Sequence, residues 1–351
     1  MFPQNLTIKS ANSEDGAPRE YRLLHESSGF VKRGGAFLEL RGTEAIEFLH
    51  RLSTNDLRSL GPGKSRPTIL TNEKGRMVDL LHVLRLSDKV LLILGGEAAD
   101  RVKSWLDKYI IMEEITTHDV SRYYERVSIL GPKAASVVAH LTQIDASGLG
   151  ESVVPLTDHP QLLLYCNSEW PIPAYEVVGP PKDIATLPAY LRDNSNVGLI
   201  SGQVSAETLN VLRIESGVPA PGTEINEEAN PLEAGLSRFV SFTKGCYIGQ
   251  EVIARLDTYK KLQRRLKGII FPKGIGVSQP GKLRYQGSDA GWTTSHAYSF
   301  TMGRDIALGY LKMIPDLTEV DFLDAGGGGT LHAEVVDLPF CKAFPEQGPG
   351  S

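Results

Sequence analysis

The chain has 351 residues, 41% of them hydrophobic, with a formal net charge of −5 and a sequence pI near 6.0. That length is enough for two or three domains. The acidic balance argues against a dedicated nucleic-acid binder, which usually carries a basic excess.

The chain ends and cysteines indicate a compartment. Residues 1–20 lack the apolar stretch of a secretory signal and carry Glu14 and Asp15. No run of about 18 apolar residues exists, so we expect no membrane-spanning helix. Cys166, Cys246 and Cys341 are scattered, and no CxxC spacing or histidine cluster accompanies them. We therefore expect a cytoplasmic protein in a reducing compartment, with no metal site of its own.

The apolar pattern predicts short strands mixed with single helices. In chain order these are strand 36–40, helix 43–52, strands 67–71, 76–86 and 90–94, helix 97–110, strand 126–130, helix 134–141, strand 174–178, and helices 184–191 and 205–216. Thr43 is the expected N-cap of the first helix. This mixture favours α+β layers over a doubly wound sheet. From Leu266 onward, strands alternate with turns, which predicts a separate barrel of about 85 residues.

Strand 76–86 carries a carboxylate among apolar residues. We expect Val78 and Leu80 on one face, and Asp79 with Leu81 on the other. A carboxylate in such a strand lies either at a sheet edge or in a lined pocket. Both alternatives stay open.

Helix 205–216 has clear end signals. Ser205 can cap its start, and Gly217 marks its end. Glu215 then lies in the last turn, where the helix dipole disfavours a carboxylate by roughly 0.3 to 1 kcal/mol. Either Glu215 is solvated and tolerates this cost, or a neighbouring group compensates for it.

The run Lys244–Glu251 (KGCYIGQE) places a thiol between a lysine and an expected helix start near Gly249. A nearby ammonium and the positive end of a helix both favour a thiolate at Cys246. The alternative is a small buried thiol in a tight turn, since free cysteine is among the most buried residue types.

The run KGCYIGQE closely resembles the signature of the YgfZ-type folate-binding proteins of iron-sulfur cluster assembly, relatives of the glycine-cleavage T-protein (aminomethyltransferase). Similar runs follow the family's order through nearly the whole chain: LSTND at 52–56, NEKGRMVD at 72–79, LRIESG at 212–217, PLEAGL at 231–236, GWTTS at 291–295 and IALGY at 306–310.

The resemblance implies an α+β, T-protein-like ring of three lobes around a central folate channel, with a C-terminal β-barrel and tetrahydrofolate as cofactor. The folate-binding region would span 20–258, with one lobe of roughly 20–55 plus 125–258 interleaved with a second at 56–124. The barrel would span 259–345.

The resemblance also implies site residues. The glutamate of the T-protein's LRLEAG motif binds the pterin, which carries over to Glu215; Arg213 is the matching arginine, and its role stays open between structural and ligand-facing. Glu176 aligns with another pterin-side glutamate. Lys244, Arg255 and Lys260 are further candidates for folate contacts. The remaining motif positions are Gly245, Tyr247, Gly249, Gln250 and Glu251.

Basic residues concentrate at the junction with the barrel. Lys260, Lys261, Arg264 and Arg265 form either a solvated face or a docking site for the anionic tail of a polyglutamylated folate.

Two departures from the T-protein pattern favour one function. The T-protein has two consecutive aspartates where this chain has Asp79-Leu80, and it lacks the cysteine of KGCYIGQE. The resemblance therefore predicts a tetrahydrofolate-binding accessory factor that assembles or repairs iron-sulfur clusters in client enzymes, with Cys246 as functional thiol. Its partners would be folate and the cluster-assembly machinery or its clients. The alternative is a tetrahydrofolate-dependent one-carbon transferase that uses Asp79 as acid or base; a folate sensor without chemistry is a third possibility.

Overall fold

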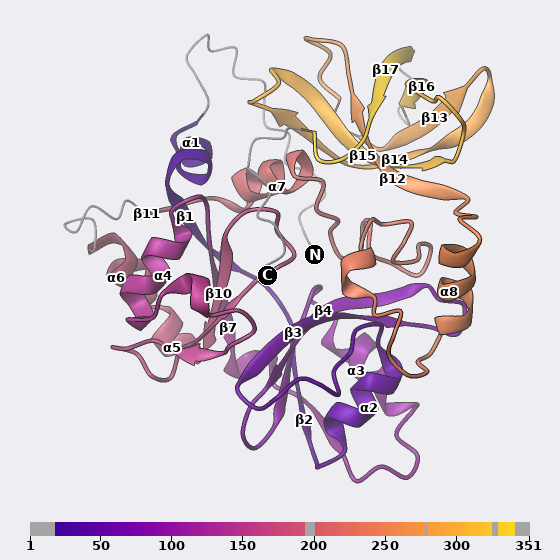
Figure 1. The fold of residues 1–351 in the computed structure, drawn as a ribbon. Helices are drawn as coiled ribbons and strands as arrows, with labels where there is room; N and C mark the ends of the chain where they lie inside the picture. The colour runs from indigo at the N-terminus through magenta and orange to yellow at the C-terminus, as the bar shows by residue number, and fades with distance from the viewer. Residues whose placement is uncertain (1–17, 194–200, 278, 325–328, 341–351) are drawn as a thin grey trace.

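The computed structural model describes residues 18–193, 201–277, 279–324 and 329–340, arranged as two sheet-based lobes and a barrel (Figure 1). The helices are α1 (Arg19–Glu26), α2 (Ala45–Leu52), α3 (Ala99–Asp107), α4 (Ala134–Thr142), α5 (Pro181–Ile184), α6 (Leu187–Asp193), α7 (Ala206–Glu215) and α8 (Gln250–Thr258). The strands are β1 (Ser28–Arg33), β2 (Phe37–Arg41), β3 (Lys64–Thr71), β4 (Met77–Arg85), β5 (Val90–Leu94), β6 (Thr116–Asp119), β7 (Glu125–Leu130), β8 (Val154–Pro155), β9 (Leu163–Cys166), β10 (Ala174–Gly179), β11 (Ser201–Gln203), β12 (Arg264–Ile270), β13 (Gly281–Tyr285), β14 (Ser288–Ser299), β15 (Arg304–Lys312), β16 (Glu319–Asp324) and β17 (Thr330–Val336).

The first lobe is a six-stranded sheet with helices on both faces. Its strand order is β11-β1-β7-β10-β9-β8, with β1 parallel to β11 and the other pairs antiparallel. Apolar side chains of α4, α5 and α6 pack on one face. Those of α1 and α7 pack on the other, so the end of α7 is held between this sheet and the barrel.

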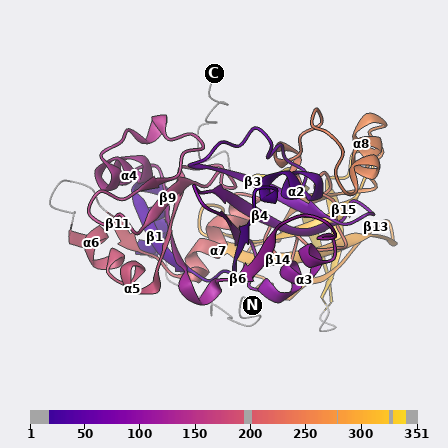
Figure 2. The same ribbon diagram turned by 90° about the horizontal axis from the view of Figure 1, so that it is seen from below.

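The second lobe is a five-stranded antiparallel sheet of order β3-β4-β5-β2-β6, with α2 and α3 packed on it. Seen from below, the two sheets lie side by side (Figure 2). The chain passes into this sheet between β1 and β2 and returns with β7. The two lobes are therefore interleaved, but the crossing falls between Arg33 and Phe37 rather than near residue 55 as expected, because β2 and α2 pack with the second sheet.

Strand β4 decides the environment of Asp79. It pairs with β3 on one side and β5 on the other, so it is an inner strand; Asp79 pairs with Leu70 of β3 and lies two residues before the pairing with β5 begins at Leu81. A register shift where β3 pairs with the start of β4 also moves Val78 onto the face of Leu81, which corrects the expected pairing of Val78 with Leu80. The bulge breaks the strict alternation of sides on which that expectation depended.

The C-terminal unit is a closed barrel of strand order β12-β15-β14-β13-β16-β17, as the strand and turn pattern predicts. Helix α8 precedes it in the chain. None of the helices in the described ranges has the length and apolar character that a membrane-spanning helix requires.

Two local predictions are wrong. Helix α2 has Glu44 rather than Thr43 at its N-cap position, without a side-chain cap. The helix expected at 184–191 is two short helices, α5 and α6. Pro188 explains the break, because proline has no N–H to bond to the carbonyl of residue 184 and its ring would clash with it. The expected cap at Ser205 is confirmed, since its side chain accepts a hydrogen bond from the Thr208 N–H.

Candidate functional site

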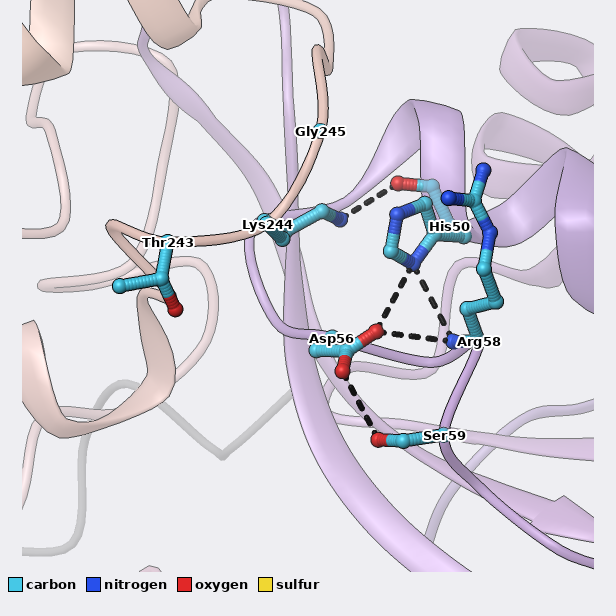
Figure 3. A pocket seen from close by; sticks show the side chains of 7 residues that line it. All are labelled: His50, Asp56, Arg58, Ser59, Thr243, Lys244 and Gly245. Carbon is cyan, nitrogen blue, oxygen red and sulfur yellow. Dashed lines mark hydrogen bonds and ion pairs between the residues drawn. The ribbon is translucent and has the colours of Figure 1, made fainter.

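Lys244, the first residue of the KGCYIGQE run, caps the C-terminal end of α2 (Figure 3). Its Nζ donates to three backbone carbonyls, those of His50 at 2.5 Å, Ser53 at 2.7 Å and Asn55 at 2.8 Å. A lysine ammonium has three N–H donors, so all are used. Burial lowers the pKa of Lys244 to about 8. Lys244 therefore has no N–H left for the Cys246 sulfur or for a folate carboxylate, contrary to both expected roles.

Further bonds attach the same segment to the second lobe. Ile248 N donates to Arg51 O at 3.1 Å, and Thr71 Oγ1 donates to Ile248 O at 2.6 Å. Upstream, Thr54 Oγ1 donates to Phe239 O at 2.7 Å. The LSTND and KGCYIGQE runs, almost 200 residues apart in the chain, thus form one structural unit.

Cys246 is exposed on this unit. The next residue, Tyr247, is buried, and its ring centre lies 5.1 Å from the Lys244 Nζ. Helix α8 begins at Gln250, directly after Gly249, which confirms the expected helix start; Glu251 is exposed in its first turn. The alternative of a thiol buried in a tight turn is therefore wrong.

A surface pocket of about 370 Å³ lies where residues 243–245 meet the end of α2 (Figure 3). Its lining is polar: His50, Asp56, Arg58, Ser59, Thr243, Lys244 and Gly245. Asp56 accepts hydrogen bonds from the Ser59 hydroxyl and from the Arg58 backbone N–H, so its carboxylate is held by its own turn.

A second cavity, the interlobe cleft, lies between the six-stranded lobe and the barrel and has about 380 Å³. It is lined by Ser168–Pro171, Ser216–Pro219, Ala234, Gly235, Arg238, Arg265, Leu266 and 337–339. Glu169 is its half-buried carboxylate, with 19% of the side chain exposed, and Arg238 and Arg265 contribute positive charge. The Trp170 Nε1 donor is buried and has no hydrogen-bond partner within the described residues.

Asp79 is buried on β4, with 2% of its surface exposed, and lines neither cavity. Burial raises the pKa of Asp79 to about 7, although Arg101 and the Leu80 N–H, 3.0 Å away, oppose the change. The negative charge of Glu169 raises this pKa further. Asp79 thus lies in the interior of the protein and titrates near neutral pH.

Glu215 is buried at the end of α7, so the solvated alternative is wrong. Its Oε2 accepts a hydrogen bond from the Tyr21 hydroxyl at 2.6 Å and its Oε1 from the Ser299 hydroxyl at 2.5 Å. These donors, from α1 and from the barrel, compensate for the unfavourable helix end.

Arg213, two residues earlier, has 11% of its side chain exposed and crosses to the barrel. It donates to Glu224 at 3.2 Å and to the Ser295 hydroxyl at 2.7 Å. Its remaining contacts go to Asn210 and to the Val218 carbonyl. This pattern favours the structural role of the two that the sequence left open.

The other expected folate contacts are dispersed. Glu176 is buried on β10, where it accepts from Ser128 at 2.8 Å and Asn167 at 2.9 Å and lies 3.3 Å from Arg33. Lys260 is 82% exposed and pairs with Asp257, and Arg255 is exposed on α8. None of these three expected contacts lines either cavity.

The basic residues at the barrel junction lie in different environments. Arg264 lies 3.4 Å from Glu233 and its guanidinium covers the Trp292 ring at 4.9 Å, so it belongs to the interior rather than to a solvated face or a docking site. Arg265 lines the cleft. The alternation of a strand explains the division, because consecutive side chains in β12 point to opposite sides.

Sequence reasoning missed the residues that line the cleft. Glu169 lies in an irregular loop, and Arg238 and Trp170 carry no periodic signal. His82, whose ring lies beside Glu169, offered one clue, an imidazole flanked by apolar residues in β4. Among the described residues, no group of three or more histidine, cysteine, aspartate or glutamate side chains could hold a metal ion.

Comparison with known proteins identifies the domains. The model of the GCVT N-terminal domain matches residues 2–151, and that of the glycine cleavage T-protein C-terminal barrel domain matches residues 264–342. The chain thus has regions that match the models of both the N-terminal and the C-terminal barrel domain of the glycine cleavage T-protein. Proteins of this GCVT family bind tetrahydrofolate as substrate or cofactor.

Individual relatives agree with this assignment. An aminomethyltransferase of Symbiobacterium thermophilum is 27% identical over 341 residues, 92% of this chain and 89% of the relative. A chloroplastic protein of Arabidopsis thaliana, whose name suggests a transferase, is 27% identical over 86% of this chain and 70% of its own length. The crystal structure of aminomethyltransferase T from Bartonella henselae superposes with a TM-score of 0.77 at 21% identity, covering 92% of this chain and 89% of that one. The T-protein-like α+β fold predicted from the motifs is thereby confirmed.

Proposed function

We propose that this GCVT-family chain is a tetrahydrofolate-binding accessory factor that assembles or repairs iron-sulfur clusters in client enzymes, with Cys246 as its functional thiol. The observation that carries the proposal is the exposure of Cys246 on a segment fixed at both ends. Lys244 fixes the start to the end of α2, and the Ile248 backbone fixes the other side to Arg51 and Thr71. Such a segment presents one sulfur to a partner at little entropic cost.

The interlobe cleft has the chemistry that folate needs. Its volume of about 380 Å³ lies within the range of small-molecule sites. The Glu169 carboxylate would accept hydrogen bonds from the amino-pyrimidinone edge of a pterin. Arg265 would pair with a carboxylate of the folate tail. Glu215 and Arg213 would act indirectly, because they hold the end of α7 whose continuation, Ser216–Pro219, forms one wall.

The test is a strain that lacks this protein, complemented with wild type or with Cys246→Ser. We expect the variant to restore no activity of iron-sulfur client enzymes, while the purified variant keeps the tetrahydrofolate Kd of the wild type. Cys166→Ser is the matched control, since that thiol is largely buried. Full restoration of client activity by Cys246→Ser would overturn the proposal.

A second function is favoured by Asp79. A carboxyl group with a pKa of about 7 suits general acid or base catalysis at neutral pH. Close relatives are named aminomethyltransferases, so a tetrahydrofolate-dependent one-carbon transferase is the alternative. It predicts that the purified chain converts tetrahydrofolate to its methylene form with a lipoyl-bound aminomethyl donor, and that Asp79→Asn abolishes turnover. Absence of turnover in the wild type would leave the accessory-factor proposal as the better one.

A further inference from the structure

His82 connects the two sheet lobes at the back of the interlobe cleft. It lies on β4, three residues after Asp79, with 3% of its side chain exposed. Its Nε2 lies 2.9 Å from Oε1 of Glu169, which belongs to the loop between β9 and β10 of the other lobe. The contact therefore joins the inner strand of one sheet to the cleft wall supplied by the other.

The contact restrains the side chain of Glu169, a residue whose backbone is already held by hydrogen bonds. The Glu169 N–H donates to Asn167 Oδ1 at 3.0 Å, and the Glu169 carbonyl accepts from Arg238 at 2.9 Å. Within the described ranges, His82 is the one side chain at ion-pair distance from the Glu169 carboxylate. Burial raises the pKa of Glu169, but His82, Arg33 and Arg126 lower it by more, so the carboxylate stays charged.

The surroundings of the pair are polar and incompletely bonded. The Tyr165 ring lies 5.0 Å from the His82 ring, and the Tyr165 hydroxyl is buried without a hydrogen-bond partner among the described residues. His82 Nδ1, His82 Nε2 and Trp170 Nε1 also lack a hydrogen-bond partner among the described residues, so the contact of Nε2 with Glu169 is an ion pair by distance and not a well-aligned hydrogen bond. Buried polar atoms in a purely structural network are normally satisfied, and exceptions concentrate at functional sites. The cluster is thus an interior polar network behind Glu169, the one of its members with a half-buried side chain in the cleft wall.

We propose that His82 is a positioning residue: it holds the Glu169 carboxylate in the orientation that a ligand with paired N–H donors requires. This inference rests on the proposed binding of folate in the cleft. Of the two carboxylates that line the cleft, Asp337 is 79% exposed and pairs with Lys267, so Glu169 is the one that a buried heterocycle could reach. A bidentate contact depends on the angle of the carboxylate as well as on its charge.

Two substitutions separate positioning from packing. His82→Gln keeps an N–H near the position of Nε2, whereas His82→Asn keeps a polar group near Nδ1 and cannot reach Glu169. Titration of the full-length chain with tetrahydrofolate should give His82→Gln a Kd within about threefold of wild type and His82→Asn a Kd at least about tenfold higher. His296→Gln, at another buried histidine located in the barrel, is the control and should leave the Kd unchanged.

A double-mutant cycle completes the test. If His82 acts through Glu169, adding His82→Asn to Glu169→Gln should weaken binding no further than Glu169→Gln alone. Equal Kd values for His82→Asn and wild type, or fully additive effects in the double mutant, would overturn the inference while folate binding stands. A wild-type chain that does not bind tetrahydrofolate would overturn the folate proposal itself, and this inference with it.

Discussion

Gly249 and Asn72 approach so closely that a Cβ on Gly249 would lie 2.5 Å from the Asn72 carbonyl oxygen. Gly249 has a φ of +82° and precedes α8, and Asn72 begins the turn between β3 and β4. The motif that presents Cys246 is thus pressed against the hairpin that carries Asp79, seven residues after Asn72. Only a residue without a side chain allows both the backbone angle and this distance.

Gly249→Ala should therefore lower the free energy of unfolding by about 1 to 3 kcal/mol, because it combines a left-handed backbone angle with a backbone clash. Chemical denaturation would measure the loss. Gly245→Ala is the matched control within the same motif, since nothing lies within 4 Å of its Cβ position and its φ is not positive. Equal stabilities of the two variants would contradict the packing described for Gly249.

The exposure of Cys246 predicts selective alkylation. In a Cys341→Ser background, iodoacetamide should modify Cys246 well before Cys166, since burial both shields the Cys166 thiol and raises its pKa. Mass spectrometry of tryptic peptides over time would follow both sites. Faster modification of Cys166 in the native protein would show that the thiol-bearing segment is not held as the structure has it.

The raised pKa of Asp79 predicts that the stability difference between wild type and Asp79→Asn depends on pH. Its pKa is raised in the folded protein from 3.8 to about 7, so the folded state binds more protons than the unfolded state between these values. The stabilising contribution of the neutral acid is complete below about pH 4 and is lost as pH rises through 7. Asp79→Asn removes the titration, and should be more stable than wild type at pH 8 by at most about 4 kcal/mol, from about three pKa units at 1.36 kcal/mol each.

Thermal unfolding of wild type and Asp79→Asn at pH 4.5, 6 and 8 would test this sign. The stability of Asp79→Asn relative to wild type should increase steadily from pH 4.5 to pH 8. A variant that is less stable than wild type at pH 8 would show that Asp79 is ionised and well paired in the native protein.

We expect the substitution of Arg213 to lower the stability of the protein strongly. Arg213→Met would leave Glu224, which is fully buried, without its ion-pair partner, a change that typically costs about 3 to 5 kcal/mol. The double variant Arg213→Met with Glu224→Leu should recover a substantial part of the stability, because no unpaired charge then remains. Urea unfolding of the three proteins gives the comparison, and a single variant as stable as wild type would refute the structural role of Arg213.

Local features of this protein follow from short stretches of sequence. The turn at 72–75, the cap at Ser205, the start of α8 after Gly249 and the terminal barrel all depend on neighbours along the chain. Turn chemistry, helix capping and strand alternation act over a few residues, so the sequence by itself determined these local features. The motifs, found in the family's order along the chain, indicated the overall fold.

The tertiary structure alone decided which groups meet. Asp79 could have lain at an edge or inside, and the strand order, which periodicity does not encode, made β4 an inner strand. Lys244 precedes Cys246 in the chain by two residues, yet its ammonium is bound by carbonyls from the end of α2. Likewise, His82 and Glu169 are 87 positions apart and come from different lobes. Such contacts depend on how apolar faces of distant elements pack, and that packing fixed the chemistry of both cavities.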